Sequence, residues 1–491
     1  MSDIIVRMPP SPTGHLHLGT ARTGLFNFLF AKNQGGSIIF RWEDTDLERS
    51  DTKFEAEILE GMKWLGIDFV EASEKFVRQT ESAEYHGEML KKLWEAGLVF
   101  PCFLTTEEID EQRAQARAQK KNFILWSPDR ETEKDELESK IESGAPYVWR
   151  FRTEKDRVIS FEDGIRGVIE VSSNTIGDFT VARTDGSVLY LLANVLDDLD
   201  QGITHILRGE DGISNTPKQL MLWEALKQLP DHTDHPIPSY SHIPLVLDQK
   251  GAKLSKRKVE PGVCVLIKDF QEQGFLPQGV VNGLAFLGWN PKSEEELFSL
   301  EDLVERFSLE GVNKAAAKYD FEKMKWFNNA WMNRLDLEEL IESFLDWNET
   351  YHDGEYNGIE VEKLMKGIEI CRQKAKTFVD LEEELSYLLF PIETPEKELL
   401  VNEKMKVDAD MAQEVLEAMI SILESLDENP SADLVKEKCV EYIQSKGLKN
   451  GQFLWPVRFS LSGRERSVGP FDLVAILGTK ESLKRIMALA S

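Results

Sequence analysis

The opening of the sequence, where two short apolar runs flank a glycine-bearing loop and a helical pattern, constrains the fold most. The first run lies in DIIVRMPPSPTG (residues 3–14) and ends in proline and glycine turns. TARTGLFNFLFAKNQGG (20–36) then spaces its apolar residues as an α-helix does and ends on glycines. GSIIFRWEDTD (36–46) is a second strand that runs into acidic residues. The pattern predicts a β–α–β unit with a parallel sheet that binds ligands where its strands end.

The rest of the chain separates into an insertion, a return to the first pattern, and a helical region. Residues 83–188 combine a charged helical pattern (107–122) with alternating strands (157–171), which is typical of an inserted domain. Residues 188–211 return to buried strand and helix patterns, so we expect them to resume the first sheet. From about residue 328 the chain shows amphipathic stretches with apolar residues at spacings of three and four, which predicts a helical bundle.

Length and hydrophobic content indicate a soluble protein with several domains. With 491 residues, 41% of them hydrophobic, the chain can bury two or more cores, because single cores stop growing at roughly 250 to 300 residues. No run approaches the ~20 apolar residues of a membrane span, and the start Met1-Ser2-Asp3 lacks the charged and apolar regions of a signal peptide. We therefore expect a cytoplasmic protein without a membrane partner.

The charge balance does not favour a nucleic-acid partner. The chain carries 58 basic and 87 acidic residues, which give a net charge of −29. Taken alone, this balance argues against nucleic-acid binding. A large chain can nevertheless confine its Lys and Arg to one binding face while acids elsewhere keep it soluble. Composition therefore leaves the question open.

The loop SPTGHLHLGTART (11–23) admits three interpretations. His15 and His17 form a His-x-His pair, which binds metal when both side chains lie on one face of a strand. The pair lies instead between Gly14 and Gly19 in a loop that opens a helix, and no third ligand follows at a recognisable spacing. Phosphate suits this loop better, because backbone N–H groups at a helix start and imidazole N–H groups bind anionic oxygens. A polar helix cap is the third interpretation.

A second phosphate-binding element lies far downstream, in AKLSKRKVEPG (252–262), a loop bounded by glycine and proline. Its basic residues are Lys253, Lys256, Arg257 and Lys258. The cationic side chains of such a loop can bind anionic phosphate groups. Together the two loops favour a triphosphate site over a metal site or a simple helix cap.

The two loops, HLGT (17–20) and KLSKR (253–257), resemble the HIGH and KMSKS signatures of class I aminoacyl-tRNA synthetases. Longer stretches are similar to bacterial glutamyl-tRNA synthetases. They are RMPPSPTGHLHLGTARTGLFNFLFA, FRWEDTD, YLLANVLDD, GITHILRGEDGISNTPKQ, GAKLSKRKV and PVRFSLSGRERSVGPFDLVAILG. These stretches follow one another from Arg7 to about Gly478, so the resemblance covers nearly the whole chain.

The chain departs from the family pattern at three positions beside the expected site. In the family, the arginine that corresponds to Arg7 is usually followed by a bulky residue, Ala and Pro. Residues 8–10 are Met-Pro-Pro here, and the additional proline stiffens the backbone. His15 stands where the family is variable, so the signature histidine is His17. Gly212 takes the place of a larger side chain, which affects the packing expected against adenine.

The cysteines predict reduced thiols and no structural zinc. They lie far apart, without a CxxC pair or a disulfide-framework spacing. Some bacterial relatives bind zinc in the insertion through a Cys-x-Cys start, but here Phe and Leu follow the first cysteine. The four residues are Cys102, Cys264, Cys371 and Cys439.

The resemblance implies ligation of glutamate to tRNA in two steps. ATP with magnesium and glutamate give glutamyl-adenylate, and the glutamyl group then passes to the 3′-terminal adenosine of tRNA(Glu), or also of tRNA(Gln). Because an anionic carboxylate must approach an anionic phosphate, positioned cations and N–H donors should supply most of the acceleration. The catalytic residues implied are His17, Thr20, Lys253 and Lys256. The residues implied to bind ATP are Gly14, His17, Gly19, Thr20, Asp211, Lys253, Ser255 and Lys256.

The resemblance places a second set of residues around the amino acid. Glutamate needs cations for its two carboxylates and an acceptor for its ammonium group. Arg208 can bind the side-chain carboxylate with paired donors, and Glu43 can accept from the ammonium group. Each residue could instead be structural, since strand-end Arg and Glu often form salt bridges. The full set is Arg7, Pro9, Ser11, Glu43, Tyr190, Asn194 and Arg208.

Contacts with tRNA are expected from basic residues of the helical region and from residues near the site. The stretch CRQKAKTF (371–378) is predicted to present its basic residues on one helical segment. A basic track on one face, with acids on the other, would reconcile a tRNA partner with the net charge. The set is Arg49, Thr216, Lys218, Arg372, Lys374, Lys376 and Arg464.

The fold implied is α/β, with a Rossmann-like parallel-sheet catalytic domain, an α+β insertion and an all-α anticodon-binding region. The segments are 1–82 with 189–241 for the catalytic domain, 83–188 for the insertion that binds the acceptor stem, 242–327 for a KLSKR-containing stem-contact domain, and 328–491 for the helical region, which can divide near 395. We expect a monomer. A glutaminyl-tRNA synthetase and a non-catalytic tRNA-binding paralogue are the alternatives. The stretches SPTG and ARTG and the intact signatures favour the glutamyl enzyme.

Overall fold

The computed structural model of the chain forms two compact units. The described residues are 4–45, 50–255 and 260–490, with the side chains of 71–74 and 231 left out. The units are Met1–Lys268 with Val281–Phe321, and Asp269–Val280 with Glu322–Ser491. Every named strand of the described residues lies in the first unit, which therefore contains the sheet predicted to bind ligands.

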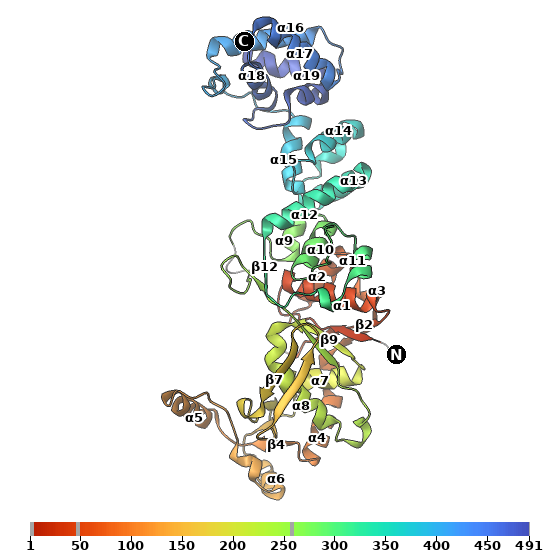
Figure 1. Cartoon of the computed structure of the whole chain (residues 1–491), viewed down its shortest axis with the longest axis vertical. Helices are drawn as coiled ribbons and strands as arrows, with labels where there is room; N and C mark the ends of the chain where they lie inside the picture. The colour runs from red at the N-terminus through yellow and green to blue at the C-terminus, as the bar shows by residue number, and fades with distance from the viewer. Residues whose placement is uncertain (1–3, 46–49, 256–259, 491) are drawn as a thin grey trace. The chain divides into compact units, whose positions relative to one another are not determined.

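The first unit opens with the predicted β–α–β arrangement (Figure 1). β1 (Ile5–Met8) pairs in parallel with β2 (Ser37–Trp42), and α1 (Leu18–Asn33) connects the two strands. His17 caps the start of α1, and Gly35, whose φ of 64° suits a glycine, follows its end. The strand, the loop and the helix expected from the sequence pattern are thus confirmed.

More strands extend this arrangement on the far side of β1. β9 (His205–Gly209) lies beside β1, where Thr204 N donates to Ile5 O at 2.9 Å. β10 (Ser239–Ile243) pairs in parallel with β9. The other strands of these two sheets are β3 (Ser73–Arg78), which pairs with β2, and β6 (Val158–Asp163) and β7 (Gly167–Ser172), which follow β10. The expectation that the first sheet itself resumes after the insertion is not met, because β9 lies beside β1 but belongs to a second sheet of order β7-β6-β10-β9.

Two helices share a hydrophobic core with these strands. α7 (Tyr190–Asp200) contributes Leu196, and α8 (Thr216–Leu226) contributes Trp223. Both side chains belong to the same buried cluster as Ile206 of β9. Burial of this cluster positions the first turn of α7 and the end of β9 in one rigid body.

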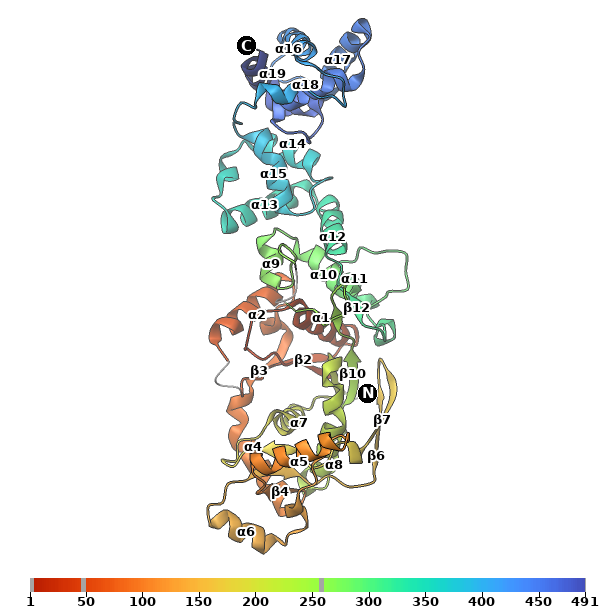
Figure 2. The same ribbon diagram turned by 90° about the vertical axis from the view of Figure 1, so that its left-hand side faces the viewer.

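The segment 83–188 combines helices with an antiparallel sheet, as its mixed pattern predicted. Its elements are α4 (Ala83–Glu95), β4 (Val99–Cys102), α5 (Thr106–Ala118), α6 (Lys134–Glu142), β5 (Val148–Phe151) and β8 (Thr180–Ala182), with sheet order β4-β5-β8. α5 has no buried residue and stands apart from the rest of this segment (Figure 1). The β6–β7 hairpin lies beside β10 instead (Figure 2), and Asp163 of β6 is the partner of Tyr240. The hairpin therefore brings residues of this segment to the sheet that contains β9.

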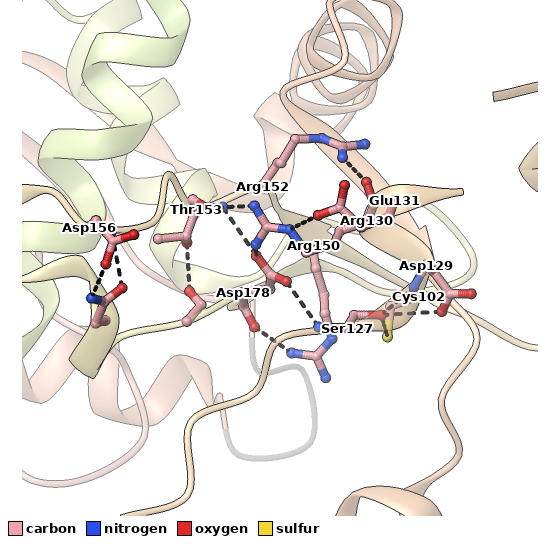
Figure 3. Close-up of polar contacts among 12 residues, drawn as sticks. Cys102, Ser127, Asp129, Arg130, Glu131, Arg150, Arg152, Thr153, Asp156 and Asp178 are labelled. Atoms are coloured by element: carbon pink, nitrogen blue, oxygen red, sulfur yellow. Dashed lines mark hydrogen bonds and ion pairs between the residues drawn. The ribbon is translucent and has the colours of Figure 1, made fainter. Parts of the chain in front are cut away.

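A buried carboxylate ties together the loops of this segment (Figure 3). Asp178 accepts hydrogen bonds from Arg130 Nη1 at 2.7 Å, from Ser127 N at 3.0 Å and from Thr153 N at 3.2 Å. Burial raises the pKa of Asp178, although the Arg130 guanidinium opposes the shift. Ser127 Oγ also donates to Cys102 Sγ at 3.3 Å. A polar network thus cross-links the loops around the first cysteine.

Other elements of the chain are mostly helical. They are α2 (Thr52–Trp64), α3 (Phe69–Ala72), β11 (Val246–Leu247), α9 (Ile267–Glu272), α10 (Pro277–Phe286), α11 (Leu300–Arg306) and β12 (Ala317–Lys318). The helices that follow are α12 (Phe321–Arg334), α13 (Leu337–Tyr351), α14 (Val361–Cys371), α15 (Phe378–Leu389), α16 (Ala409–Glu424), α17 (Ala432–Lys446), α18 (Asn450–Ser462) and α19 (Pro470–Ala490). The helical C-terminal region is thereby confirmed. No helix within the described ranges is long and apolar enough to cross a membrane.

The prediction that the basic residues of CRQKAKTF share a helical segment is wrong. α14 ends at Cys371, and Arg372, Lys374 and Lys376 lie in the turn before α15. Thr377 caps α15 by accepting from Asp380 N at 3.2 Å, and this cap fixes where the new helix starts.

Candidate active site

The two predicted phosphate-binding segments lie side by side. Leu18 N, at the start of α1, donates to Val265 O at 2.9 Å, and Ile267 N donates to Leu16 O at 3.0 Å. These bonds form a short antiparallel bridge. The bridge ties the loop before α1 to the chain that follows the KLSKR loop.

A cavity of about 840 Å³ lies beside these segments, where β1, β2 and β9 end. Ligands of parallel sheets bind at this end of the strands. Most predicted site residues line the cavity. They are Arg7, Pro9, His17, Gly19, Thr20, Glu43, Tyr190, Arg208, Asp211, Lys253 and Ser255. Gly14, Ser11 and Asn194 do not line it, and Lys256 lies outside the described residues.

His17 combines a helix cap with a donor suited to phosphate. Its Nδ1 accepts from Gly19 N at 3.1 Å, so a neutral His17 ring carries its proton on Nε2. The first turn of α1 contains no acid, and the N–H groups of a helix start attract anions. The interpretations as phosphate loop and as helix cap are therefore compatible.

Lys253, at the base of the KLSKR loop, forms an ion pair with Asp211. Lys253 Nζ lies 2.9 Å from Asp211 Oδ2, and both side chains are 61% exposed. Exposed pairs contribute little to stability, so a phosphate group can displace the carboxylate from the ammonium group. The pair places the ammonium group of Lys253 beside Asp211, which follows β9.

Two buried arginines of neighbouring strands share one aspartate. Asp198 Oδ1 lies 3.1 Å from Arg7 Nε and 2.8 Å from Arg41 Nη2, and none of the three side chains is more than 1% exposed. Burial alone would lower the pKa of Arg41, but the carboxylates of Asp198 and Glu43 raise it above its ordinary value. The shared carboxylate thereby holds Arg7 in the cavity wall.

Glu43 lies at the end of β2, where Asn194 Nδ2 donates to its Oε1. Gln219 Nε2 in turn donates to Asn194 Oδ1 at 3.4 Å. Burial raises the pKa of Glu43, while Arg41 and Arg7 act to lower it. A cationic group bound in the cavity would stabilise the ionised form of Glu43 in the same way.

Arg208 is held on two sides of its guanidinium. Its Nε donates to His242 Nε2 at 3.2 Å, and its Nη2 donates to Thr216 Oγ1 at 2.8 Å and to Gly212 O at 3.1 Å. The Nη1 groups of Arg208 and Arg7 are buried and have no hydrogen-bond partner among the described residues. Two donors at one cavity are therefore available to an anionic ligand.

Arg22 is a functional candidate that the sequence interpretation missed. It lines the cavity at 3% exposure, and its guanidinium donates to Leu287 O at 2.6 Å and to Pro244 O. Burial lowers the pKa of Arg22 to about 10, and no described carboxylate forms an ion pair with it. Arg22 could have been predicted from the sequence, because it lies two residues after Thr20 on the helix that starts at the proposed phosphate loop.

Three more residues around the site were not predicted. His15 lines the cavity, and its Nδ1 lies 2.6 Å from Glu57 Oε2. Arg41 lies near the end of β2, and His242 is the parallel-register partner of Arg208. The position of Arg41 and His242 at strand ends was the signal that could have found them.

Of the residues predicted to contact tRNA, some form ion pairs, one is buried, and others are partly or fully exposed. Lys376 Nζ is 2.8 Å from Glu322 Oε2, and Arg464 Nη1 is 3.0 Å from Glu383 Oε1. Thr216 is fully buried and uses its hydroxyl inside the first unit, so we assign it to the support of the site and not to tRNA. Arg49 lies outside the described residues, while Lys218, Arg372 and Lys374 are partly or fully exposed.

A metal cluster is absent from the part of the chain that the structure describes, because no three His, Cys, Asp or Glu side chains come together in a way that could hold an ion. All four cysteines are buried. Their side chains therefore belong to the packed interior.

Family models match nearly the whole chain. The model described as tRNA synthetases class I (E and Q), catalytic domain, matches residues 3–326, and the model described as anticodon binding domain matches residues 336–490. Glutamate–tRNA ligase 1 of Caldanaerobacter subterraneus subsp. tengcongensis is 35% identical, with 99% of this chain and 97% of the relative covered. Glutamate–tRNA ligase of Aquifex aeolicus is 35% identical, with 99% of this chain and 98% of the relative covered.

A solved structure is similar along the entire chain. It is a glutamate tRNA ligase from Elizabethkingia meningosepticum in complex with its amino acid. The TM-score is 0.85 at 29% sequence identity, and the match covers 100% of this chain and 99% of that one.

Proposed function

The chain belongs to the class I tRNA synthetases of the E and Q group, and from this premise we propose that it ligates glutamate to tRNA. In the first step an oxygen of the glutamate α-carboxylate attacks the α-phosphorus of ATP, a P–O bond forms, and pyrophosphate leaves. In the second step a hydroxyl of the terminal ribose of tRNA attacks the activated carbonyl carbon, and AMP leaves.

The observation that carries the glutamate assignment is the pair of Nη1 groups of Arg7 and Arg208 at one cavity. Two cationic donors suit a ligand with two carboxylates, and Glu43 suits an ammonium group. Tyr190 and Pro9 complete the wall of the same cavity. Asn194 acts through Glu43, and Ser11 is proposed from the resemblance alone.

The ATP end of the reaction is assigned to the start of α1 and the KLSKR loop. His17 and the side chain of Thr20, at the start of α1, bind phosphate oxygens, and Lys253 with Lys256 closes over the β- and γ-phosphates. Gly14, Asp211 and Ser255 complete the proposed ATP set. Magnesium accompanies ATP and neutralises phosphate charge in this reaction.

The tRNA end is assigned to three segments of the chain. We propose that 83–188 binds the acceptor stem, that 242–327 contacts the stem, and that 328–491 binds the anticodon. The residues proposed to contact tRNA are Arg49, Lys218, Arg372, Lys374, Lys376 and Arg464. The protein is proposed to act as a cytoplasmic monomer.

The experiment that tests this function is aminoacylation of purified tRNA isoacceptors with labelled glutamate and, separately, labelled glutamine. Glutamate on tRNA(Glu) is the expected product. Ligation of glutamate to tRNA(Gln) as well would show that the enzyme accepts both tRNAs. Glutamine as the only amino acid ligated would identify a glutaminyl enzyme, and tRNA binding without ligation would identify a non-catalytic relative.

A further inference from the structure

Arg208 and His242 are neighbours on parallel strands, and both side chains are buried. Their Cα atoms are register partners of β9 and β10, with exposures of 8% for Arg208 and 0% for His242. Arg208 Nε donates to His242 Nε2 at 3.2 Å. An imidazole can accept this bond only with an unprotonated Nε2, so the tautomer of His242 decides whether the contact exists.

Asp163 of the β6–β7 hairpin sets that tautomer. Its Oδ2 lies 2.5 Å from His242 Nδ1, and both side chains are fully buried. The carboxylate also accepts from the backbone N–H groups of Ile165 at 3.0 Å and Arg166 at 2.9 Å. Burial acts against ionisation, but these donors and His242 lower the pKa of Asp163, so the carboxylate is ionised and His242 Nδ1 carries the proton.

The Arg208 side chain packs against Gly212, where any larger residue would clash with it. A Cβ at Gly212 would lie 2.5 Å from Arg208 Nε and 2.8 Å from Arg208 Cδ. Thr216 Oγ1 accepts from Nη2, and the guanidinium carbon lies 5.4 Å from the centre of the Tyr240 ring. Nε and Nη2 are thereby occupied, and Nη1 is the nitrogen that remains for a ligand.

We propose that His242, oriented by Asp163, is a positioning residue that holds Arg208 for recognition of the glutamate side-chain carboxylate. The proposal rests on the proposed function. His242 does not touch the substrate; it fixes the guanidinium so that Nη1 faces an acceptor. A glutamine side chain would place an amide NH₂ group in the same position, where it meets a donor.

Two variants separate this role from a general role in folding. His242→Asn retains a nitrogen near the Nδ1 position for Asp163 and removes the Nε2 acceptor of Arg208. Gly212→Ala leaves His242 intact and displaces Arg208 by the clash described above. His205→Asn is the matched control, because His205 lies at the other end of β9 and bonds Thr204.

The measurement is kcat and KM for glutamate and for glutamine, with tRNA and ATP held at saturation. We expect both test variants to raise KM for glutamate about 10-fold and to lower the glutamate-to-glutamine ratio of kcat/KM by a similar factor, because one buried hydrogen bond is lost. We expect kcat for glutamate to stay within about 2-fold of wild type in both variants, and KM for ATP, measured separately, to stay within about 2-fold in His242→Asn. The His205 control should match wild type.

An unchanged ratio in His242→Asn, beside a lowered ratio in Gly212→Ala and wild-type protein active on glutamate, would overturn the assignment of His242 alone. A decrease in kcat and in thermal stability together with an increase in KM for ATP, each as large as the change in KM for glutamate, would also overturn it, because such changes indicate a structural role. Failure of wild-type protein to ligate glutamate to any tRNA would overturn the proposed function together with this inference. If His242→Asn does not fold, an unchanged ratio in Gly212→Ala would still overturn the proposal, because the position of Arg208 would then not set the choice of amino acid.

Discussion

Asp198 Oδ1 accepts a hydrogen bond from Arg7 Nε at 3.1 Å, and each of the two side chains is only 1% exposed. The same oxygen lies 2.8 Å from Arg41 Nη2, so one carboxylate serves two buried cations. Removing a partner from such a group leaves uncompensated charge in the interior. Asp198 therefore stabilises the first unit and orients Arg7 at the same time.

Replacement of the Asp198 carboxylate should lower the stability of the protein. We expect Asp198→Ala to lower the free energy of unfolding by about 3 to 5 kcal/mol, measured by urea denaturation, because Arg7 and Arg41 lose their shared partner. Asp200→Ala on the same helix is the matched control, since Asp200 is exposed and should change stability by less than about 0.5 kcal/mol. Equal effects of the two substitutions would contradict the network.

Arg208 should set the choice of glutamate over glutamine. The two amino acids are nearly isosteric, so discrimination must come from hydrogen-bond polarity, which can reach a factor on the order of 10⁴. We expect Arg208→Gln to lower the ratio of kcat/KM for glutamate and glutamine by about 10²-fold. The exposed Arg183→Gln should leave the ratio as it is. A wild-type ratio in Arg208→Gln would make this arginine structural.

Lys256 should act in the transition state of adenylation. Loss of one charge-assisted contact there costs roughly 3 to 4 kcal/mol, by analogy with removal of an oxyanion donor. Lys256→Ala should therefore lower ATP–pyrophosphate exchange about 10²- to 10³-fold while the affinity for glutamate changes little. Lys250→Ala is the control, because Lys250 is exposed and precedes the loop. Activity of Lys256→Ala within about 2-fold of wild type would show that the loop does not close on ATP.

Exchange itself should require tRNA. The resemblance to glutamyl enzymes implies that the amino-acid site assembles only with tRNA bound, whereas most class I relatives need no such help. ATP–pyrophosphate exchange with glutamate should therefore be seen with cognate tRNA and not without it. Full exchange in a preparation treated with ribonuclease would contradict this expectation.

The stability of the fold should fall in mild acid because of His242. Burial lowers the pKa of His242 below its ordinary 6.5, Arg208 and Arg166 lower it further, and Asp163 opposes the shift. Below pH 6.5 the unfolded chain binds a proton that the folded chain does not, so the contribution is present above pH 6.5 and is lost as pH falls towards the folded pKa. Urea denaturation at pH 7.5 and 5.5 should show a loss that His242→Asn reduces. The same loss in both proteins would rule out His242 as its source.

Local sequence patterns were sufficient to predict several elements of this fold. The opening β–α–β unit, the phosphate loop at the start of α1 and the basic loop at Lys253 each depend on residues close together in the chain. Apolar spacing decides strand against helix over such distances, and glycine marks where the backbone must turn. The resemblance to a known family, and not local pattern, implied most of the predicted cavity-lining residues, including Arg7, Glu43 and Arg208.

Only the tertiary structure decided what holds those residues in place. Arg208 lies on β9, its acceptor His242 on β10 and the orienting Asp163 on β6, three strands far apart in sequence. Which strands pair, and in which register, depends on the packing of the whole core, and a change of one residue in register turns every side chain to the other face. Arg7 and Arg41 share Asp198 for the same reason, since α7 and two strands must all be docked before the three charges meet. The sequence thus indicated which groups are expected to do the chemistry, and the packing of the strands and helices determined which groups hold them in place.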